Sequence, residues 1–213
     1  MKIRTIILII TVFVTGNLLA QDRYGLTFGV GTSKIDYLEL ANKKNGYETY
    51  DLYYENLLSW NCGFYYIKSV HSKSLDIGGE LLVKGMGSFM KYYDDTENNK
   101  LFSYRERLIY LSLPIFIRIK INNRCYIQPG LSNSILLNRP ELSDKISTKK
   151  YYELGGDLTF GVSLSHKINL EIKGYHGFTH NSSNIEGGFS WMDTRLFNSS
   201  FTLSLQYELG QRK

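Results

Sequence analysis

Apolar and polar positions alternate strictly along RLIYLSLPIFIRIKI, which covers residues 107–121. The apolar face carries Ile109, Leu111, Leu113, Ile115, Ile117, Ile119 and Ile121. Residues between them, such as Tyr110, Ser112 and Arg118, share the other face. Successive side chains of a β-strand point to opposite sides, so the pattern predicts one strand with an apolar stripe about 40 Å long. Strands of soluble proteins usually have only about 5–6 residues, and so long a stripe needs a special environment.

Eight strand-like stretches and no convincing helix follow the first twenty residues. They cover residues 22–31, 57–69, 74–89, 103–121, 124–137, 151–165, 168–179 and 198–209. The connections between them alternate long and short. Outer-membrane barrels have short periplasmic turns and longer extracellular loops. The predicted fold is therefore an all-β, eight-stranded antiparallel up-and-down transmembrane β-barrel with long extracellular loops and short periplasmic turns.

The N-terminus has the layout of a secretory signal peptide. Lys2 and Arg4 precede the apolar run IILIITVFV, and Ala20 is a small residue at the expected cleavage point. The apolar run is too short to span a membrane as a helix, and no later run is long enough. No Cys follows it for a lipid anchor. We predict a cleaved signal peptide over residues 1–20, a single barrel domain over residues 21–213, and localisation in the outer membrane.

Composition excludes several other classes. The formal charge of +5 includes Lys2 and Arg4 of the predicted signal peptide, and the remaining charge is small and dispersed. This argues against nucleic acid as a partner. The two cysteines, Cys62 and Cys125, lie in strand-like stretches and do not form a disulfide framework. The four histidines show no spacing with Asp or Glu that suits zinc. We expect no metal or cofactor.

The polar faces of the strands bear on a rival fold, the soluble lipocalin-like barrel that carries a ligand in an apolar interior. Alternation alone cannot separate the two, because inverting the barrel leaves the pattern unchanged. The polar faces hold small residues and charges of both signs: Gly25, Thr27, Gly29, Gly78, Glu80, Gly155, Asp157, Thr159, Gly161, Ser163, Glu171 and Lys173. Small residues suit a narrow interior, where charges can pair. The pattern favours the membrane barrel, with its apolar stripe against lipid.

These inward charges also predict a closed lumen. Eight strands enclose an interior just wide enough for side chains, and unpaired charges there would cost several kcal/mol. We expect a structural polar network that includes Glu80, Lys84, Arg118, Asp157, Glu171 and Lys173. Glu80 and Arg118 are predicted to pair with each other. The competing interpretation is that the basic members form a path for anions.

Tyrosines gather in the first predicted loop, residues 32–56. They are Tyr37, Tyr47, Tyr50, Tyr53 and Tyr54. Tyrosine supplies a large amphipathic contact area, and loops on a rigid scaffold often carry binding. We predict that partner recognition lies here; the alternative is a solvated loop whose tyrosines pack on their own strands. The expected surroundings are outer-membrane lipid and lipopolysaccharide, with an envelope or secretion-apparatus protein as partner and the barrel itself a monomer.

One short cluster raises the question of enzymatic activity. His180, Ser182 and Asn184 follow the pattern His-x-Ser-x-Asn, one residue out of step with the His-x-Ser-Asn motif of lipid A deacylases. The cluster falls where the seventh predicted strand enters a long loop, which does not fix the geometry that a nucleophile and its base need. A plain polar loop is the favoured interpretation, and a lipid A-modifying, deacylase-like enzyme stays the alternative to a non-enzymatic structural or surface-interaction barrel.

Several of these stretches resemble the PorT-like family of outer-membrane β-barrels, a group of small OmpA-like barrels. The stretch at residues 107–121 resembles the family pattern YLxIPLLxK, with Leu111, Pro114 and Ile115 on marked positions and Arg118 where the family usually has Lys. YIQPGL, FGVSL and IKGYHGFTH resemble later family strands. The resemblance implies a small exported barrel, with one branch associated with protein secretion. Pro114 cannot donate to a sheet ladder, so we also expect a bulge there.

Overall fold

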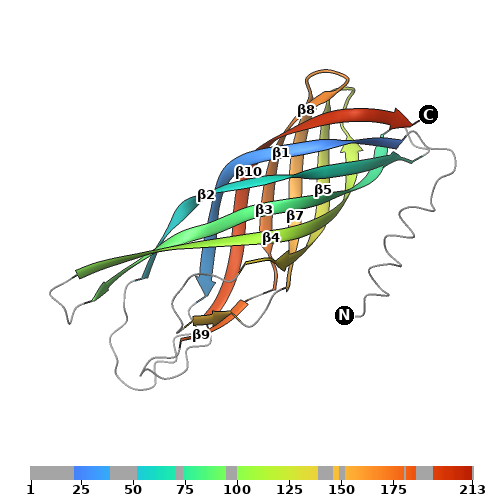
Figure 1. Ribbon diagram of the computed structural model, residues 1–213. Helices are drawn as coiled ribbons and strands as arrows, with labels where there is room; N and C mark the ends of the chain where they lie inside the picture. The colour runs from blue at the N-terminus through green and yellow to red at the C-terminus, as the bar shows by residue number, and fades with distance from the viewer. Residues whose placement is uncertain are drawn as a thin grey trace.

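The computed structural model describes residues 22–38, 52–70, 74–94, 100–138, 146–148, 152–179, 181–185 and 194–212. Eight long strands form a wall (Figure 1): β1 (Asp22–Leu38), β2 (Leu52–Ser69), β3 (Leu75–Asp94), β4 (Lys100–Lys120), β5 (Cys125–Leu136), β7 (Tyr152–Ser163), β8 (Ile168–Gly177) and β10 (Thr194–Arg212). Two short strands, β6 (Ile146–Thr148) and β9 (Asn181–Ile185), pair with each other, and β9 also pairs with the start of β10.

None of the described residues forms a helix that is long and apolar enough to cross a membrane.

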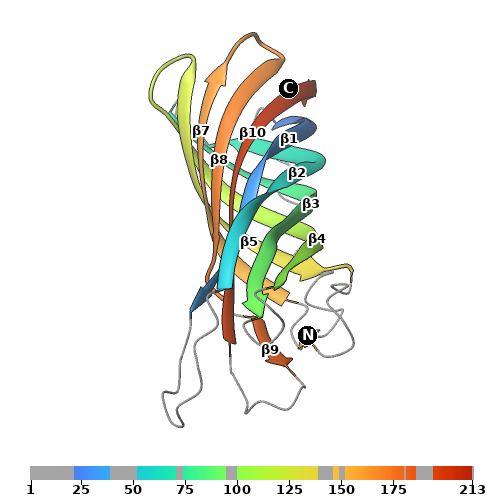
Figure 2. The ribbon, with the colours of Figure 1, turned by 90° about the vertical axis from the view of Figure 1, so that its left-hand side faces the viewer.

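The wall is closed. Each long strand pairs antiparallel with the next, and β10 pairs back onto β1 from Asp22 with Arg212 to Leu38 with Arg195. Figure 2 shows β7, β8, β10, β1, β2, β3 and β4 side by side in this order. The predicted eight-stranded antiparallel barrel is confirmed. The prediction missed β6 and β9, because they are short extensions inside segments that read as polar loops.

The strands are staggered around the barrel. A path along paired residues, strand by strand, leaves β1 at Arg23 and returns to it at Ser33, ten residues farther along. Its steps are Arg23, Ile67, Gly78, Phe116, Gly130, Asp157, Tyr175, Ser200 and Ser33. Such a stagger requires strands that are tilted by roughly 35–45° to the barrel axis. Side chains on neighbouring strands therefore form inclined layers across the lumen.

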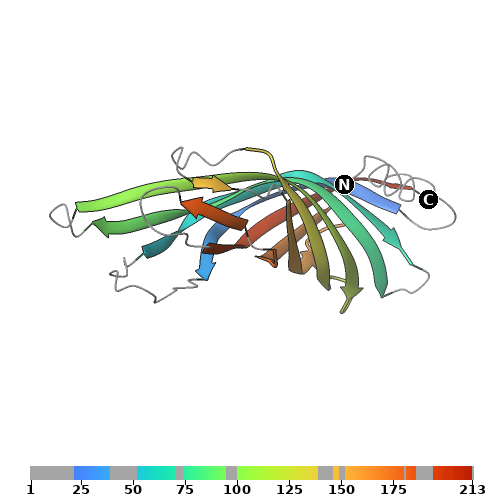
Figure 3. The same ribbon diagram turned by 90° about the horizontal axis from the view of Figure 1, so that it is seen from below.

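The two ends of the barrel differ. Residues 121–124 connect β4 to β5 and residues 164–167 connect β7 to β8, while both described chain ends, Asp22 and Arg212, pair at this same end. The turn side chain of Asn122 accepts hydrogen bonds from the N–H groups of Arg124 and Cys125, at 2.8 and 2.7 Å. We call this the turn end, which faces the periplasm in an outer-membrane barrel. At the other end, β3 and β4 project beyond the remaining strands (Figures 1 and 3).

The outer face is apolar over the body of the wall. Along β4, Leu111, Leu113, Ile115, Ile117 and Ile119 are 37–44% exposed. The same alternation holds on β1, β7 and β10, where apolar residues point outward and Gly, Thr, Ser or Gln point inward. A soluble lipocalin-like barrel would have the opposite arrangement, with the apolar residues inside. The long stripe thus faces lipid, as predicted, and beyond it β4 exposes Arg105 and Arg107.

The first predicted loop is shorter than expected, which is a correction to the boundaries of residues 32–56. Backbone pairing with β10 carries β1 on to Leu38, and pairing with β3 begins β2 at Leu52. The register between β2 and β3 shifts between Asn56 and Trp60. There the hydroxyl of Ser33 on β1 accepts from the Gly87 N–H at 2.8 Å and donates to its carbonyl at 2.9 Å. A side chain thus substitutes for the local backbone pairing, which a period-two pattern cannot reveal.

Aromatic rings cover lumen-facing glycines on adjacent strands. The pairs are Tyr126 over Gly161, Tyr175 over Gly155 and Phe116 over Gly78. A Cβ atom on Gly161 would lie only 2.1 Å from the Tyr126 ring, so any other residue would push the ring away. Aromatic residues packed on glycines in this way pin the register of a curved sheet.

Pro114 does not mark a bulge, and this prediction was wrong. Pairing of β3 with β4 is interrupted between Gly79 with Ile115 and Leu82 with Ser112, but the register is the same on both sides. The missing N–H of Pro114 is thus accommodated by a gap in the ladder without an inserted residue.

Candidate functional site: a filled polar lumen

An ion-paired triad lies nearest the turn end of the lumen. Asp76 at the start of β3 is fully buried and binds Arg23 of β1 at 2.5 Å and Lys120 of β4 at 3.0 Å. The two cations are 21% and 32% exposed. The Asp76 carboxylate therefore connects β3 to its neighbour β4 and also to β1, which is not next to β3 in the wall.

Arg118 lies in the lumen next to this triad and is 2% exposed. Its guanidinium binds Glu171 of β8 at 3.3 Å and Gln206 of β10 at 3.0 Å, donates to Gln128 of β5, and lies 3.9 Å from the centre of the Tyr126 ring. The hydroxyl of Tyr126 donates to Glu171 at 2.8 Å. One cation on β4 thus connects β4, β5, β8 and β10 across the full width of the barrel.

Lys173 adds to this layer on the side away from the turn end. Its ammonium group lies 2.6 Å from a carboxylate oxygen of Glu80 and 3.1 Å from one of Glu171. Gln206 also donates to Glu80 at 3.0 Å. Two anions and two cations, Glu80, Glu171, Arg118 and Lys173, therefore balance within one hydrogen-bonded group, as buried charges require.

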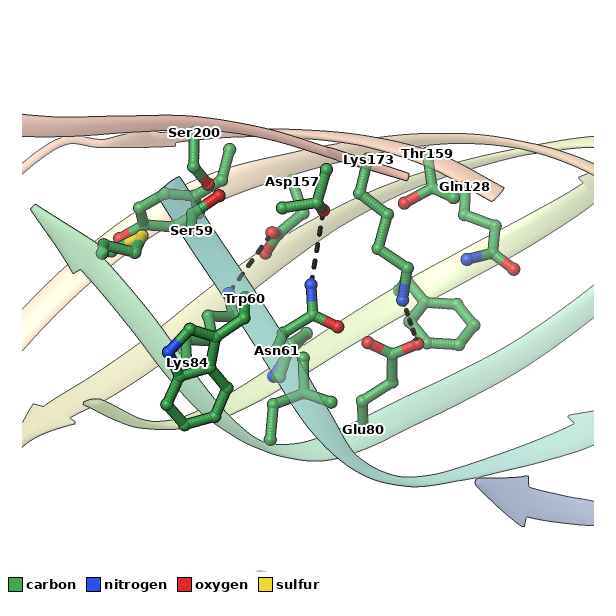
Figure 4. Close-up of a pocket in the computed structure, with 16 residues that line it drawn as sticks. Ser59, Trp60, Asn61, Glu80, Lys84, Gln128, Asp157, Thr159, Lys173 and Ser200 are labelled. Carbon is green, nitrogen blue, oxygen red and sulfur yellow. Dashed lines mark hydrogen bonds and ion pairs between the residues drawn. The ribbon is translucent and has the colours of Figure 1, made fainter. Parts of the chain in front are cut away.

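The next layer contains Lys84 and Asp157, whose charged atoms lie 3.7 Å apart. Lys84 also donates to Ser132 at 3.3 Å and lies 4.6 Å from the centre of the Tyr175 ring. Ser132 continues a chain of hydroxyl groups, at 2.7 Å from Ser112. Figure 4 shows Lys84 pointing at Asp157 and Lys173 pointing at Glu80.

A last polar group and an apolar layer close the other end. Glu153 is 1% exposed and accepts hydrogen bonds from Tyr175 and from the side-chain amide of Asn198. That amide also donates to the Tyr110 hydroxyl at 2.9 Å. The apolar layer above them consists of the buried side chains Leu57, Met86, Leu108 and Leu136.

Little space is left between these layers. The cavity drawn in Figure 4, lined by Asn61, Lys84, Asp157 and Lys173 among others, has a volume of about 30 Å³. A single water needs roughly 10–15 Å³ by this measure, so the cavity holds one or two waters. Several buried polar atoms beside it, including the Ser59 hydroxyl and the Asn61 amide oxygen, have no hydrogen-bond partner among the residues that the structure describes. Such waters would satisfy them.

The six charged residues predicted to line the lumen are all brought together there. The predicted pairing of Glu80 with Arg118 is wrong, because each finds another partner: Glu80 binds Lys173 and Arg118 binds Glu171. The cross-strand neighbour of Arg118 in the register is Asp76, four positions before Glu80. Alternation assigns a side chain to a face, but it fixes neither the register nor the partner across the lumen.

Sequence reasoning missed the neutral members of the network. Three of the four residues that contact Arg118 are neutral, namely Tyr126, Gln128 and Gln206, but the predicted network included only charged residues. A signal was available, because Gln128 and Gln206 lie on the inward parity of their strands. In a strand that crosses lipid, an inward-facing glutamine can form its hydrogen bonds only inside the lumen.

The tyrosines of the first loop are divided by the structure. Tyr37 lies in β1, and Tyr53 and Tyr54 lie in β2, so these three belong to the wall and not to a loop. Tyr47 and Tyr50 lie outside the described residues. Partner recognition through this segment stays a prediction.

The deacylase-like cluster is also divided. Ser182 and Asn184 lie in β9, which pairs with β10 and β6, whereas His180 is outside the described residues. Within the part of the chain that the structure describes, no group of three or more His, Cys, Asp or Glu could hold a metal ion.

Comparison with known proteins agrees with this architecture. Residues 19–183 match the family model described as outer membrane protein beta-barrel domain. The fold is similar to that of the outer membrane protein OprG from Pseudomonas aeruginosa, at 9% sequence identity over 89% of this chain and 95% of that one, with a TM-score of 0.50. It is also similar to AlkL, solved in DMPC lipid bilayers, at 10% identity over 92% of both chains, with a TM-score of 0.48.

The attachment invasion locus protein Ail of Yersinia pestis, solved with the heparin analogue sucrose octasulfate, is similar over 90% of this chain and all of that chain, at 11% identity and a TM-score of 0.42. No curated protein matches by sequence. The closed wall, the outward apolar belt and the family match define an outer-membrane β-barrel. The chain belongs to the outer membrane protein beta-barrel domain family.

Proposed function

We propose that this protein is a non-enzymatic, non-conducting outer-membrane barrel that acts through the surface it presents outside the cell. The observation that carries the proposal is the filled lumen. Buried ion pairs and hydrogen bonds cross it from Asp76 at the turn end to Glu153 near the other end. A barrel without an open interior offers no route for a solute, which leaves its wall and its outer end to interact with other molecules.

At the outer end, β3 and β4 extend as a paired hairpin beyond the lipid-facing stripe. β4 continues from Ile109, the last residue of its lipid-facing stripe, through Arg107 and Arg105 to Lys100. β3 pairs with it over this whole extension, as far as Asp94 with Lys100. A paired, hydrogen-bonded extension holds the segments attached to it in fixed positions, as a rigid scaffold does for binding loops.

The partner that we propose is an envelope protein, including one of a secretion apparatus, as the resemblance to PorT-like barrels suggests. The lipid A-modifying alternative would rest on the His-x-Ser-x-Asn cluster, of which His180 lies outside the described residues. The barrel itself is proposed to be a monomer in lipopolysaccharide-containing membrane.

Replacement of residues 39–51 by a short glycine- and serine-rich turn tests the proposal. This variant keeps the strand segments 32–38 and 52–56, which the structure places in the wall. We expect it to assemble in the outer membrane and to lose proteins that cross-link to and copurify with the wild type. A matched variant with residues 139–145 replaced serves as control. An unchanged set of copurifying proteins in both variants would contradict a role for the first segment.

A further inference from the structure

A basic pocket lies at the turn end, outside the filled part of the lumen. It has a volume of about 70 Å³. Its lining consists of Arg23, Arg118, Lys120, Asn122, Asn123, Arg124, Tyr126 and Ser163. Four of these side chains are cationic, and none is acidic. The pocket is separated from the cavity in the lumen by the Arg118 layer.

The positive charge of this pocket is only partly balanced. Asp76 is shared between Arg23 and Lys120, and Glu171 is bound by Arg118. Arg124 is exposed and forms no ion pair with any residue that the structure describes. Three of the four cations are thus paired with two carboxylates, which leaves Arg124 without an ion pair among the described residues, beside a space that an anion can enter.

Hydrogen bonds hold the turn backbone and Arg118 in place at this pocket. The Asn122 side chain holds the N–H groups of Arg124 and Cys125, and the Ile121 N–H donates to the Cys125 carbonyl at 2.9 Å. Arg118 is fixed by its buried partners on three other strands. Binding an anion here would order the exposed Arg124 side chain but would require little change of the turn backbone or of Arg118, which favours affinity.

We propose that this pocket binds a phosphate group. Arginine guanidinium groups match the geometry of phosphate oxygens and bind them through charge-assisted hydrogen bonds. The amides of Asn122 and Asn123 add neutral donors at the same rim. Two sources in the periplasm carry this chemistry, free phosphate and the phosphodiester headgroup of an inner-leaflet phospholipid. The site is independent of the proposed surface function, because it lies at the opposite end of the barrel.

The test compares two variants that each remove one exposed arginine. Arg124→Gln removes a cation from the pocket, and Arg107→Gln removes one from the other end of the wall. Inorganic phosphate is titrated into the folded full-length protein in micelles by calorimetry at constant ionic strength. In a second arm, each protein is placed in nanodiscs of phosphatidylcholine with phosphatidylglycerol, and bound lipid is measured by native mass spectrometry.

We expect phosphate binding to weaken about tenfold or more in Arg124→Gln, the effect of losing a hydrogen bond to a charged group, and to be unchanged in Arg107→Gln. If free phosphate does not bind but phosphatidylglycerol is retained by the wild type and lost only in Arg124→Gln, the headgroup is the ligand. Absence of binding in both arms, or equal binding by the two variants, would overturn the site.

Discussion

Replacement of Arg118 by Met removes the central charge of the lumen and keeps a long side chain in its place. The change deletes the ion pair with Glu171 at 3.3 Å, the hydrogen bond to Gln206 at 3.0 Å and the stacking on the Tyr126 ring. Breaking a buried pair by removing one partner costs about 3–5 kcal/mol. Glu171 still contacts Lys173 at 3.1 Å, so we expect a cost near the lower limit, about 3 kcal/mol of unfolding free energy.

A double-mutant cycle with Glu171→Gln isolates the interaction itself. When both charges are absent, neither residue is left as an unpaired buried ion, and Lys173 keeps Glu80 at 2.6 Å. We expect the two costs to be less than additive by about 1–3 kcal/mol. Lys120→Met is the matched control, because Lys120 is 32% exposed and Asp76 keeps Arg23. Its expected cost is at most about 1 kcal/mol.

The assay is reversible urea unfolding in lipid vesicles, followed by tryptophan fluorescence and by gel mobility without boiling. If Arg118→Met costs no more than Lys120→Met, or if the cycle is additive, the buried network does not stabilise the barrel as the geometry indicates. The variant should also remain non-conducting, since the layers formed by Lys84 with Asp157 and by Glu153 with Tyr175 still fill the section.

Three further predictions concern the wall. Ile115→Arg places a charge on the lipid face and should impair insertion by about 2–4 kcal/mol, measured as the folded fraction in vesicles; tolerance equal to that of a loop position would contradict the outward assignment. Gly161→Ala should cost about 1–3 kcal/mol because its Cβ would meet the Tyr126 ring. Gly174→Ala, whose Cβ would lie 3.8 Å from the carbonyl oxygen of Leu158, should stay within about 0.5 kcal/mol; similar urea midpoints would refute the glycine–aromatic packing. The folded protein should resist SDS until it is boiled, because a closed wall has no free edge; an unheated sample that runs as an unfolded chain would contradict closure.

Much of the wall could be predicted because a membrane barrel imposes one simple rule on its sequence. Lipid outside and a narrow polar lumen inside force each strand to alternate, so period two places Ile115 and Ile117 on one face and residues such as Glu171 on the other. The small and charged residues of the second face then assign it to the lumen. The number of strands in the wall follows from counting the alternating stretches. Alternation does not fix where the strands end outside the lipid, because water can form hydrogen bonds with the backbone of a strand or of a loop there. β1 and β2 therefore extend beyond their predicted limits, and β6 and β9 were missed.

The pairing inside the lumen could not be predicted, because it depends on the stagger of the whole barrel. Lys173 and Glu80 lie on strands that are not neighbours, and their contact is set by registers accumulated around the wall. The pocket at the turn end was missed for the same reason. Arg23 and Arg124 are far apart in sequence, and only closure of β1 against β10 brings the chain ends of the barrel to the β4–β5 turn.

Planar-bilayer recording of the purified protein tests most directly whether the lumen is closed. Folding of each sample is first verified by its gel mobility before and after boiling. A section filled by Arg118, Glu171, Lys84 and Asp157 predicts no steady unit conductance at any applied voltage that the bilayer withstands. Reproducible conductance steps of constant size from the folded protein would contradict the closed lumen.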